Sequence, residues 1–160
     1  MSELNIRDIE NGGCSMKITQ ENIKDADCLA EIRTVAMKPS LEKLGRYDPQ
    51  RIRKRFLDTF VASDTWKIEM DGKVAGFFVL RDKNDHFYLD HFYIHPIFQN
   101  KKLGSVVIEY IVKITETRQL SIKLGALKGS SSNRFYLNHG FKKISEDEFD
   151  IYYERVPQML

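Results

Sequence analysis

The sequence predicts a single α/β domain whose central sheet is mixed, mostly antiparallel and flanked by helices. Two stretches carry this prediction. In the first, the strand-like runs 65–70 and 73–81 are joined by Asp71 and Gly72, a pair that favours the type I′ turn of a β-hairpin. In the second, a strand-like run over 86–95 is followed by a short polar loop and an amphipathic helix. The chain has 160 residues, which is the length of one domain with a substantial core.

Composition and charge exclude several classes of protein. The chain is 42% hydrophobic and 30% charged, as globular domains are, and its formal net charge is +2. This small charge argues against a nucleic-acid partner and against an anionic membrane surface. No apolar run approaches the roughly 18 residues of a membrane-spanning helix, and no signal-peptide core is present. Cys14 and Cys28 make no disulfide framework, so we expect free thiols in a cytoplasmic protein.

The N-terminal part is expected to contain an extension, a short strand and a helix. Residues 1–15 are polar and show little periodicity, which predicts a flexible extension before a domain of residues 16–160. A short strand is expected near residues 17–19. Apolar residues recur at helical spacing over 23–37, and Pro39 is expected to end this helix.

A second helix follows, with one apolar and one basic side. It begins at Asp48, an N-cap residue, with Pro49 at the first helical position. Its apolar residues are Ile52, Phe56, Leu57 and Phe60, and its basic residues are Arg51, Arg53, Lys54 and Arg55. Two interpretations of the basic side stay open: a solvated surface with a few ion pairs, or a surface that attracts an anionic substrate or a nucleotide phosphate. Nucleic-acid binding is a third hypothesis, which the near-neutral net charge opposes.

The elements after the hairpin complete the sheet. They are a turn over 82–85, the strand 86–95, a helix with apolar residues Leu103, Val106, Val107, Tyr110, Ile111 and Ile114, a strand over 121–126, a short helix over 133–138 that stops at Gly140, and closing strands over 141–144 and 150–155. The sequence shows no internal repeat or linker, which supports one domain.

The polar loop before the longer of these helices suits an anion. Gly104 and Ser105 lie at the helix start, where backbone N–H groups without helical acceptors meet the positive end of the helix dipole. Lys101 and Lys102 add positive charge, although lysines in a loop are more often simply solvated. The residues alone therefore allow either a phosphate site or a purely structural loop.

Two motifs in this half resemble those of the GNAT superfamily, the acetyl-CoA-dependent N-acetyltransferases. The first, HPIFQNKKLGS (95–105), resembles the acetyl-CoA motif, in which Q/R-x-x-G-x-G/A begins a helix after a strand and a Pro-containing turn. Gln99 and Gly104 match that pattern, whereas Lys102 stands where its first glycine is expected. We expect Lys102 to need no positive φ, because the loop is already turning into the helix.

The second motif, SSNRFYLNHGF (131–141), resembles the C-terminal motif of the family, where a short helix bearing Phe-Tyr precedes Gly-Phe. The matching residues are Phe135, Tyr136, Gly140 and Phe141. An Asn ahead of this pair contacts the pantetheine arm in the family, and Asn133 lies somewhat later than that position. The resemblance covers about residues 16–156.

The resemblance implies a fold, a co-substrate and a set of contacts. The sheet is expected to splay at the acetyl-CoA site, between 92–94 and 122–126. The implied cofactor-binding residues are Phe92, Tyr93, Ile94, Gln99, Asn100, Lys101, Lys102, Leu103, Gly104, Ser105 and Asn133. Backbone groups of Phe92 and Ile94 would pair with pantetheine, and the amides of 99–105 would hold the pyrophosphate. A backbone N–H near Phe92 or Tyr93 would stabilise the oxyanion of the tetrahedral intermediate.

The resemblance also implies catalytic residues. Tyr136 occupies the position of the general acid that protonates the departing thiolate, while its neighbour Phe135 makes a packed aromatic the alternative. Asp90 is the first candidate for the general base and His91 the second, since strand alternation places them on opposite faces and a bulge would invert the assignment. For either residue, a hydrogen-bonded polar side chain at a strand kink is an equal alternative.

Partners and metals follow from the same patterns. His91 and His95 are four residues apart, but on a strand and without a third ligand they predict no metal site. The implied acceptor is a primary amine of a small molecule or a peptide, and relatives that are dimers make a homodimer compatible with the resemblance. A non-catalytic acyl-CoA sensor of the same fold is the alternative function, supported by Lys102 in place of glycine.

Overall fold

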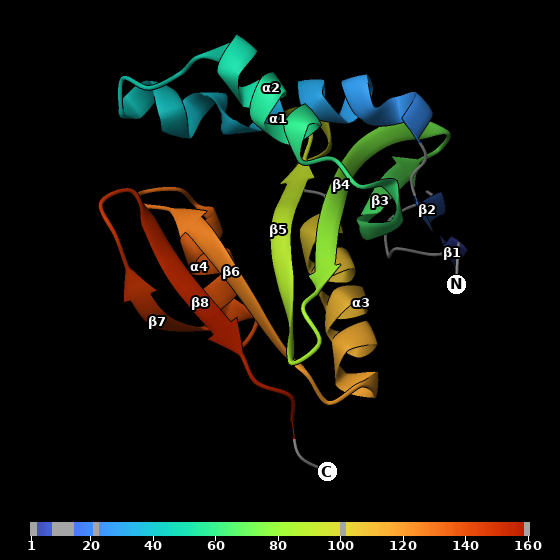
Figure 1. Cartoon of the computed structure of the whole chain (residues 1–160). Helices are drawn as coiled ribbons and strands as arrows, with labels where there is room; N and C mark the ends of the chain where they lie inside the picture. Colours follow the sequence, from blue (N-terminus) through green and yellow to red (C-terminus); the bar gives the residue numbers. More distant parts are fainter. Residues whose placement is uncertain (1–2, 8–14, 21–22, 100–101, 159–160) are drawn as a thin grey trace. The chain divides into compact units, whose positions relative to one another are not determined.

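The computed structural model describes residues 3–7, 15–20, 23–99 and 102–158 (Figure 1). The chain forms two compact units: the first unit comprises residues 1–79 and 91–99, and the second unit residues 80–90 and 100–160. Among the described residues, no helix is long and apolar enough to cross a membrane.

The described strands form one sheet in the order β1-β2-β3-β4-β5-β6-β8-β7. They are β1 (Glu3–Arg7), β2 (Ser15–Gln20), β3 (Thr65–Met70), β4 (Lys73–Asp82), β5 (His86–Ile94), β6 (Ser121–Leu127), β7 (Lys142–Glu146) and β8 (Asp150–Arg155). The β5–β6 pair is parallel, whereas β1–β2, β2–β3, β3–β4, β6–β8 and β7–β8 are antiparallel. The prediction of a mixed, mostly antiparallel sheet is therefore confirmed.

The parallel pair β5–β6 is short. Its ladder joins only His86–Tyr88 with Ser121–Lys123, although β6 continues to Leu127.

Helices accompany the strands in both units. They are α1 (Ala26–Lys43), α2 (Pro49–Asp58), α3 (Leu103–Thr117) and α4 (Ser132–Asn138), with 3₁₀ turns η1 (Ile23–Asp25), η2 (Ala62–Asp64) and η3 (Pro96–Phe98). The predicted end of α1 at Pro39 is wrong, because the helix continues through it. Burial of Leu41 beyond the proline stabilises the extra turn and offsets the lost hydrogen bond.

Local sequence signals explain several element ends. Asp71 and Gly72 both have positive φ (49° and 80°), as the predicted type I′ hairpin requires. The Asp48 side chain accepts a hydrogen bond from the Arg51 backbone N–H at 3.2 Å and so caps α2. Strand β1 lies in the stretch for which no strand was predicted, and Ser15, the last residue of the expected extension, begins β2. Residues 1–2 and 8–14 of that extension, including Cys14, lie outside the described residues.

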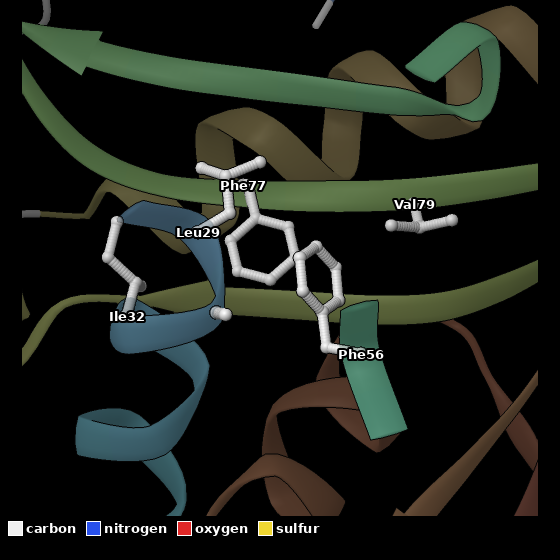
Figure 2. Close-up of a cluster of buried hydrophobic side chains, with 6 residues drawn as sticks. Leu29, Ile32, Phe56, Phe77 and Val79 are labelled. Atoms are coloured by element: carbon white, nitrogen blue, oxygen red, sulfur yellow. The ribbon is translucent and has the colours of Figure 1, made fainter. Parts of the chain in front are cut away.

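The core of the first unit lies where α1 and α2 pack on β4 (Figure 2). Its buried members are Leu29, Ala30 and Ile32 from α1, Phe56 from α2, and Phe77 and Val79 from β4. The apolar spacing predicted for both helices is what places these side chains on the faces turned to the strand. In the second unit, α3 buries Leu103, Val107, Ile108 and Ile111 in the same manner.

Candidate functional site

The candidate base Asp90 is held by an ion pair within the second unit. Its Oδ2 accepts a hydrogen bond from Arg81 Nε at 2.9 Å, and the Arg81 side chain is 15% exposed. The contact joins neighbouring strands β4 and β5, and it fixes the direction of the carboxylate. A structural role therefore accounts for Asp90 as fully as a catalytic one does.

The other candidate base, His91, lies in an aromatic cluster of the first unit. Its ring centroid is 5.4 Å from that of Phe56 on α2, 6.3 Å from Phe77 on β4 and 5.8 Å from Tyr93. Leu89 and His91 are buried while Tyr88 and Asp90 are half-buried, so the expected alternation of β5 is present. Helix α2 thus packs directly against the strand that carries both candidate bases.

Tyr93 shares this environment with a cation from α1. The guanidinium carbon of Arg33 lies 6.0 Å from the Tyr93 ring centroid, and Arg33 Nη1 donates to the Ile52 carbonyl of α2 at 2.6 Å. Arg33 therefore ties α1, α2 and β5 together. Sequence analysis missed this residue because its partners lie far away along the chain.

The basic side of α2 is partly neutralised inside the first unit. Arg53 pairs with Glu31 at 2.6 Å, and Lys54 pairs with Asp58 at 2.6 Å. These exposed pairs match the interpretation of a solvated helix surface, although they do not involve the remaining arginines of the helix.

The segment after β5 is organised by its own side chains. His95 Nδ1 accepts from the Ile97 backbone N–H at 3.2 Å, and Gln99 Nε2 donates to the Ile94 carbonyl at 2.9 Å. Gln99, the first residue of the Q/R-x-x-G-x-G/A pattern, therefore also stabilises the turn that follows β5. Asn100 and Lys101, both expected to contact the cofactor, lie outside the described residues. Three or more metal-ligating side chains do not cluster anywhere in the described ranges.

Lys102 adopts a left-handed backbone at the N-cap of α3, with φ 60° and ψ 12°. The expectation that it needs no positive φ is wrong. A glycine adopts this conformation freely, whereas a residue with a Cβ, such as this lysine, adopts it only with strain. The cost of this backbone is about 1–2 kcal/mol for an L-residue.

The backbone N–H groups in the first turn of α3 have no acceptor within the helix. The Lys102 side chain makes no capping hydrogen bond, and the first backbone contact of the turn runs from the Val106 N–H to the Lys102 carbonyl at 3.2 Å. The N–H groups of Leu103, Gly104 and Ser105 precede it and have no acceptor within the helix. This geometry is suited to phosphate oxygens.

Helix α4 packs on this first turn. A Cβ at Gly104 would lie 3.2 Å from the Phe135 ring, and Ser105 Oγ lies 3.2 Å from His139 Nε2. A side chain at Gly104 would therefore require the Phe135 ring to shift by a few tenths of an ångström. Sequence analysis passed over His139, whose only signal is its position before Gly140.

The candidate acid Tyr136 lies in an aromatic cluster of the second unit. Its side chain is 7% exposed, and its ring centroid is 5.4 Å from Phe135, 5.4 Å from Phe141 and 6.4 Å from Tyr153. Gly140, with φ 86°, ends α4 and returns the Phe141 N–H to the Tyr136 carbonyl at 3.1 Å. The predicted helix stop is therefore present and fixes the backbone of Tyr136.

Asn133 holds the start of α4. Its Nδ2 donates to the carbonyls of Leu127 and Ser130 at 2.9 and 3.0 Å, and its Oδ1 accepts from the Tyr153 hydroxyl at 2.7 Å. Both amide hydrogens are engaged, so only an oxygen lone pair remains for a cofactor. The structure joins Asn133, Tyr136, Gly104 and Ser105 through α4 in the second unit, whereas Phe92, Tyr93, Ile94 and Gln99 belong to the first unit.

A comparison with family models identifies one family. The sequence matches the family model described as acetyltransferase (GNAT) domain over residues 29–153. A comparison with curated protein sequences finds no match.

Solved structures share the fold at low sequence identity. The PaiA N-acetyltransferase from Thermoplasma acidophilum in complex with coenzyme A has a TM-score of 0.70 at 19% identity, covering 88% of this chain and 98% of that one. The ribosomal-protein-S18-alanine N-acetyltransferase from Escherichia coli has a TM-score of 0.71 at 16% identity, covering 91% and 96%. Ard1 from Thermoplasma volcanium has a TM-score of 0.67 at 16% identity, covering 90% and 99%.

Proposed function

The chain belongs to the GNAT acetyltransferase family, and from this premise we propose that it transfers an acetyl group from acetyl-CoA to a primary amine. The observation that carries the proposal is the family match, which spans residues 29–153 and includes both motifs. Similarity to an N-acetyltransferase in complex with coenzyme A supports the choice of co-substrate.

The cofactor contacts proposed for the second unit lie at the start of α3. The amides of Leu103, Gly104 and Ser105 would hold the pyrophosphate, and the Lys102 ammonium would lie beside it. Asn133 would offer its remaining oxygen lone pair to the pantetheine arm. The other proposed contacts, Gln99, Asn100 and Lys101 of the motif and the backbone of 92–94, come from the family pattern.

The proposed reaction is direct attack of a neutral amine on the thioester carbon. The C–N bond would form first and give a tetrahedral intermediate, whose oxyanion a backbone N–H near Phe92 or Tyr93 would stabilise. The C–S bond would break as this intermediate collapses to the amide and the thiolate. The Tyr136 hydroxyl would give its proton to the departing sulfur. The amine loses its proton to a base, and the contacts favour His91 over Asp90 because the Asp90 carboxylate already accepts a hydrogen bond from Arg81.

A pair of tyrosine variants tests the reaction. Tyr136→Phe should lower turnover by about 10²-fold or more and leave acetyl-CoA binding unchanged, because only the proton donor is removed. Tyr110→Phe is the matched control, since the Tyr110 hydroxyl on α3 is buried without a hydrogen-bond partner among the described residues. Thiol release would report turnover, and calorimetry would report binding.

The same experiment addresses the acyl-CoA sensor. Tight binding of acetyl-CoA with no thiol release above buffer, across a panel of primary amines and of peptides with free N-termini, would support the sensor over the enzyme. The panel includes both acceptor classes because two of the similar structures are described as N-acetyltransferases, one of them for a protein alanine. No binding of acetyl-CoA at all would contradict both functions.

A further inference from the structure

The histidine that follows α4 contacts the first turn of α3, where the pyrophosphate is proposed to bind. His139 Nε2 lies 3.2 Å from Ser105 Oγ, in the first turn of α3. Both side chains are partly buried, and both belong to the second unit. Neither the hydroxyl nor the imidazole has another side-chain hydrogen-bond partner in the described part of the chain.

The imidazole is held in place on several sides. Its ring centroid is 4.6 Å from that of Phe135, the residue that also contacts Gly104. The His139 backbone N–H donates to the Tyr136 carbonyl at 3.0 Å, and its carbonyl accepts from Arg155 Nε at 3.3 Å. The backbone of His139 is hydrogen-bonded and its ring packs on Phe135, so the imidazole stays opposite Ser105. The protonation state of the imidazole therefore decides whether the Ser105 hydroxyl donates or accepts the hydrogen bond between them.

The hydroxyl has one proton to give. When His139 Nε2 carries a lone pair, the Ser105 hydroxyl donates its proton to the ring and presents only lone pairs to the α3 N-terminus. When the ring is protonated, Nε2 can only donate, so Ser105 accepts from it and its own proton must point elsewhere. A phosphate oxygen at the start of α3 is an acceptor for that proton, and the imidazolium adds a positive charge behind it.

We propose that His139 is a positioning residue for the cofactor's pyrophosphate, which acts through Ser105 Oγ and makes cofactor affinity rise as the pH falls. The inference rests on the proposed function and adds a residue that the family motifs do not supply. Because protonation favours binding, binding must favour protonation to the same extent, and the protein takes up a proton as the cofactor binds.

The charged groups around His139 are constant over the range in which a histidine titrates. Arg155 on β8 contacts the His139 carbonyl, and a guanidinium keeps its charge there. Glu116 on α3 accepts a hydrogen bond from Arg155 at 2.9 Å, which lowers the pKa of Glu116 and keeps it ionised. Lys102 is a further charged residue, at the N-cap of α3.

The test measures affinity for dephospho-coenzyme A by calorimetry at pH 5.5, 6.5 and 8. This probe keeps the pyrophosphate and lacks the 3′-phosphate monoester, whose own titration near pH 6 would confuse the result. The wild-type dissociation constant should be about three- to tenfold lower at pH 5.5 than at pH 8, the effect of one charge-assisted hydrogen bond at a partly exposed site. His139→Gln should remove this dependence, because an amide donates at every pH.

His86→Gln is the matched control. His86 belongs to the same unit and contacts Asp85 at 2.6 Å rather than Ser105, so this variant should keep the wild-type pH dependence. Ser105→Ala should weaken binding at pH 5.5 more than at pH 8, because the relay passes through the hydroxyl.

Proton uptake provides a readout that needs no variant. Wild-type binding enthalpies at pH 6.5 in two buffers of different ionisation enthalpy should differ by the proton taken up, and equal enthalpies would overturn the inference. Equal pH dependence in the wild type and in His139→Gln would also overturn it, while acetyl-CoA binding in both proteins would leave the proposed function standing. Failure of the wild type to bind either ligand at any pH would overturn the function itself.

Discussion

At the scale of single residues, Lys102 combines strain with a candidate role. Its left-handed backbone at the start of α3 is one that glycine adopts without cost. A strained residue at a proposed ligand site suggests that the side chain is retained for its charge. Replacement of Lys102 by glycine should therefore raise the stability of the fold and lower its affinity for the cofactor.

Substitution of this lysine separates the two effects. Lys102→Gly should raise the free energy of unfolding by about 1 kcal/mol through relief of the left-handed strain. Lys113→Gly, an exposed position in the middle of the same helix, should lower it by about 1 kcal/mol. Urea denaturation measures both. Equal destabilisation by the two variants would show that the Lys102 backbone is not strained.

The charge of this residue is tested by Lys102→Ala. This variant keeps a Cβ and therefore the strain, but it loses the ammonium group. We expect weaker binding of acetyl-CoA at low salt and a smaller difference from the wild type at high salt, because added ions screen the charge. Calorimetry at two salt concentrations measures this, and unchanged affinity at low salt would remove Lys102 as a cofactor contact.

At the scale of elements, the first unit depends on a close approach of β4 and β5. A Cβ at Gly76 would lie 2.3 Å from the Tyr93 carbonyl oxygen and 3.1 Å from Ile94 Cα. The neighbouring His95 N–H donates to the Ala75 carbonyl at 2.7 Å. The missing side chain thus lets the two strands meet where β5 carries the backbone groups proposed for pantetheine.

Gly76→Ala should therefore be strongly destabilising. The obstructing atoms belong to the backbone and cannot rotate away, so we expect a loss of about 3 kcal/mol, at the upper end for overpacking. Gly45→Ala is the control: it has positive φ but nothing within 4 Å, and it should cost about 1 kcal/mol. Equal losses of unfolding free energy in the two variants, measured by thermal or urea unfolding, would show that the close contact at Gly76 does not add to the cost of the substitution.

The end of β7 carries a carboxylate with two cationic partners. Glu146 pairs with Lys128 at 2.7 Å and also with Lys143. Hydrogen bonds from both ammonium groups lower the pKa of Glu146 from its usual 4.5 to about 2. Since the folded pKa is the lower one, the ion pairs stabilise the fold above pH 4.5, and this contribution is lost as the pH falls towards 2.

Replacement of this carboxylate should make the stability of the fold depend less on pH in the acid range. Glu146→Gln should lose stability at pH 7 and show a smaller drop than the wild type between pH 4.5 and 2. Glu148→Gln is the control, because Glu148 in the same turn forms no ion pair among the described residues, and it should keep the wild-type slope. Urea midpoints at several pH values measure the slopes. Parallel curves for the wild type and Glu146→Gln would contradict the assignment.

At the scale of the whole molecule, a ligand that binds only the folded chain must stabilise it. At a hundredfold excess over its dissociation constant, acetyl-CoA should add about 2.7 kcal/mol to the free energy of unfolding. Thermal unfolding with acetyl-CoA and with adenosine, which lacks the phosphates, measures the effect. An equal shift with adenosine would show that the phosphate contacts proposed at α3 contribute little.

The sequence by itself determined the elements whose signals are local. Asp71–Gly72 specified a hairpin because both residues accept positive φ, and Asp48 with Pro49 specified the start of α2. Gly140 specified the end of α4, and the two motifs in their order specified the family. Each of these depends on neighbours within a few residues, so each can be recognised without the fold.

Only the tertiary structure decided contacts between residues distant in sequence. The ion pair of Asp90 with Arg81, the engagement of Asn133 by Tyr153 and the contact of Ser105 with His139 all join separate elements. The same holds for the continuation of α1 past Pro39, and for the positive φ of Lys102 at the start of α3. Local propensity ranks the conformations open to each residue, but packing against distant partners selects among them, because burial outweighs about 1 kcal/mol of local preference.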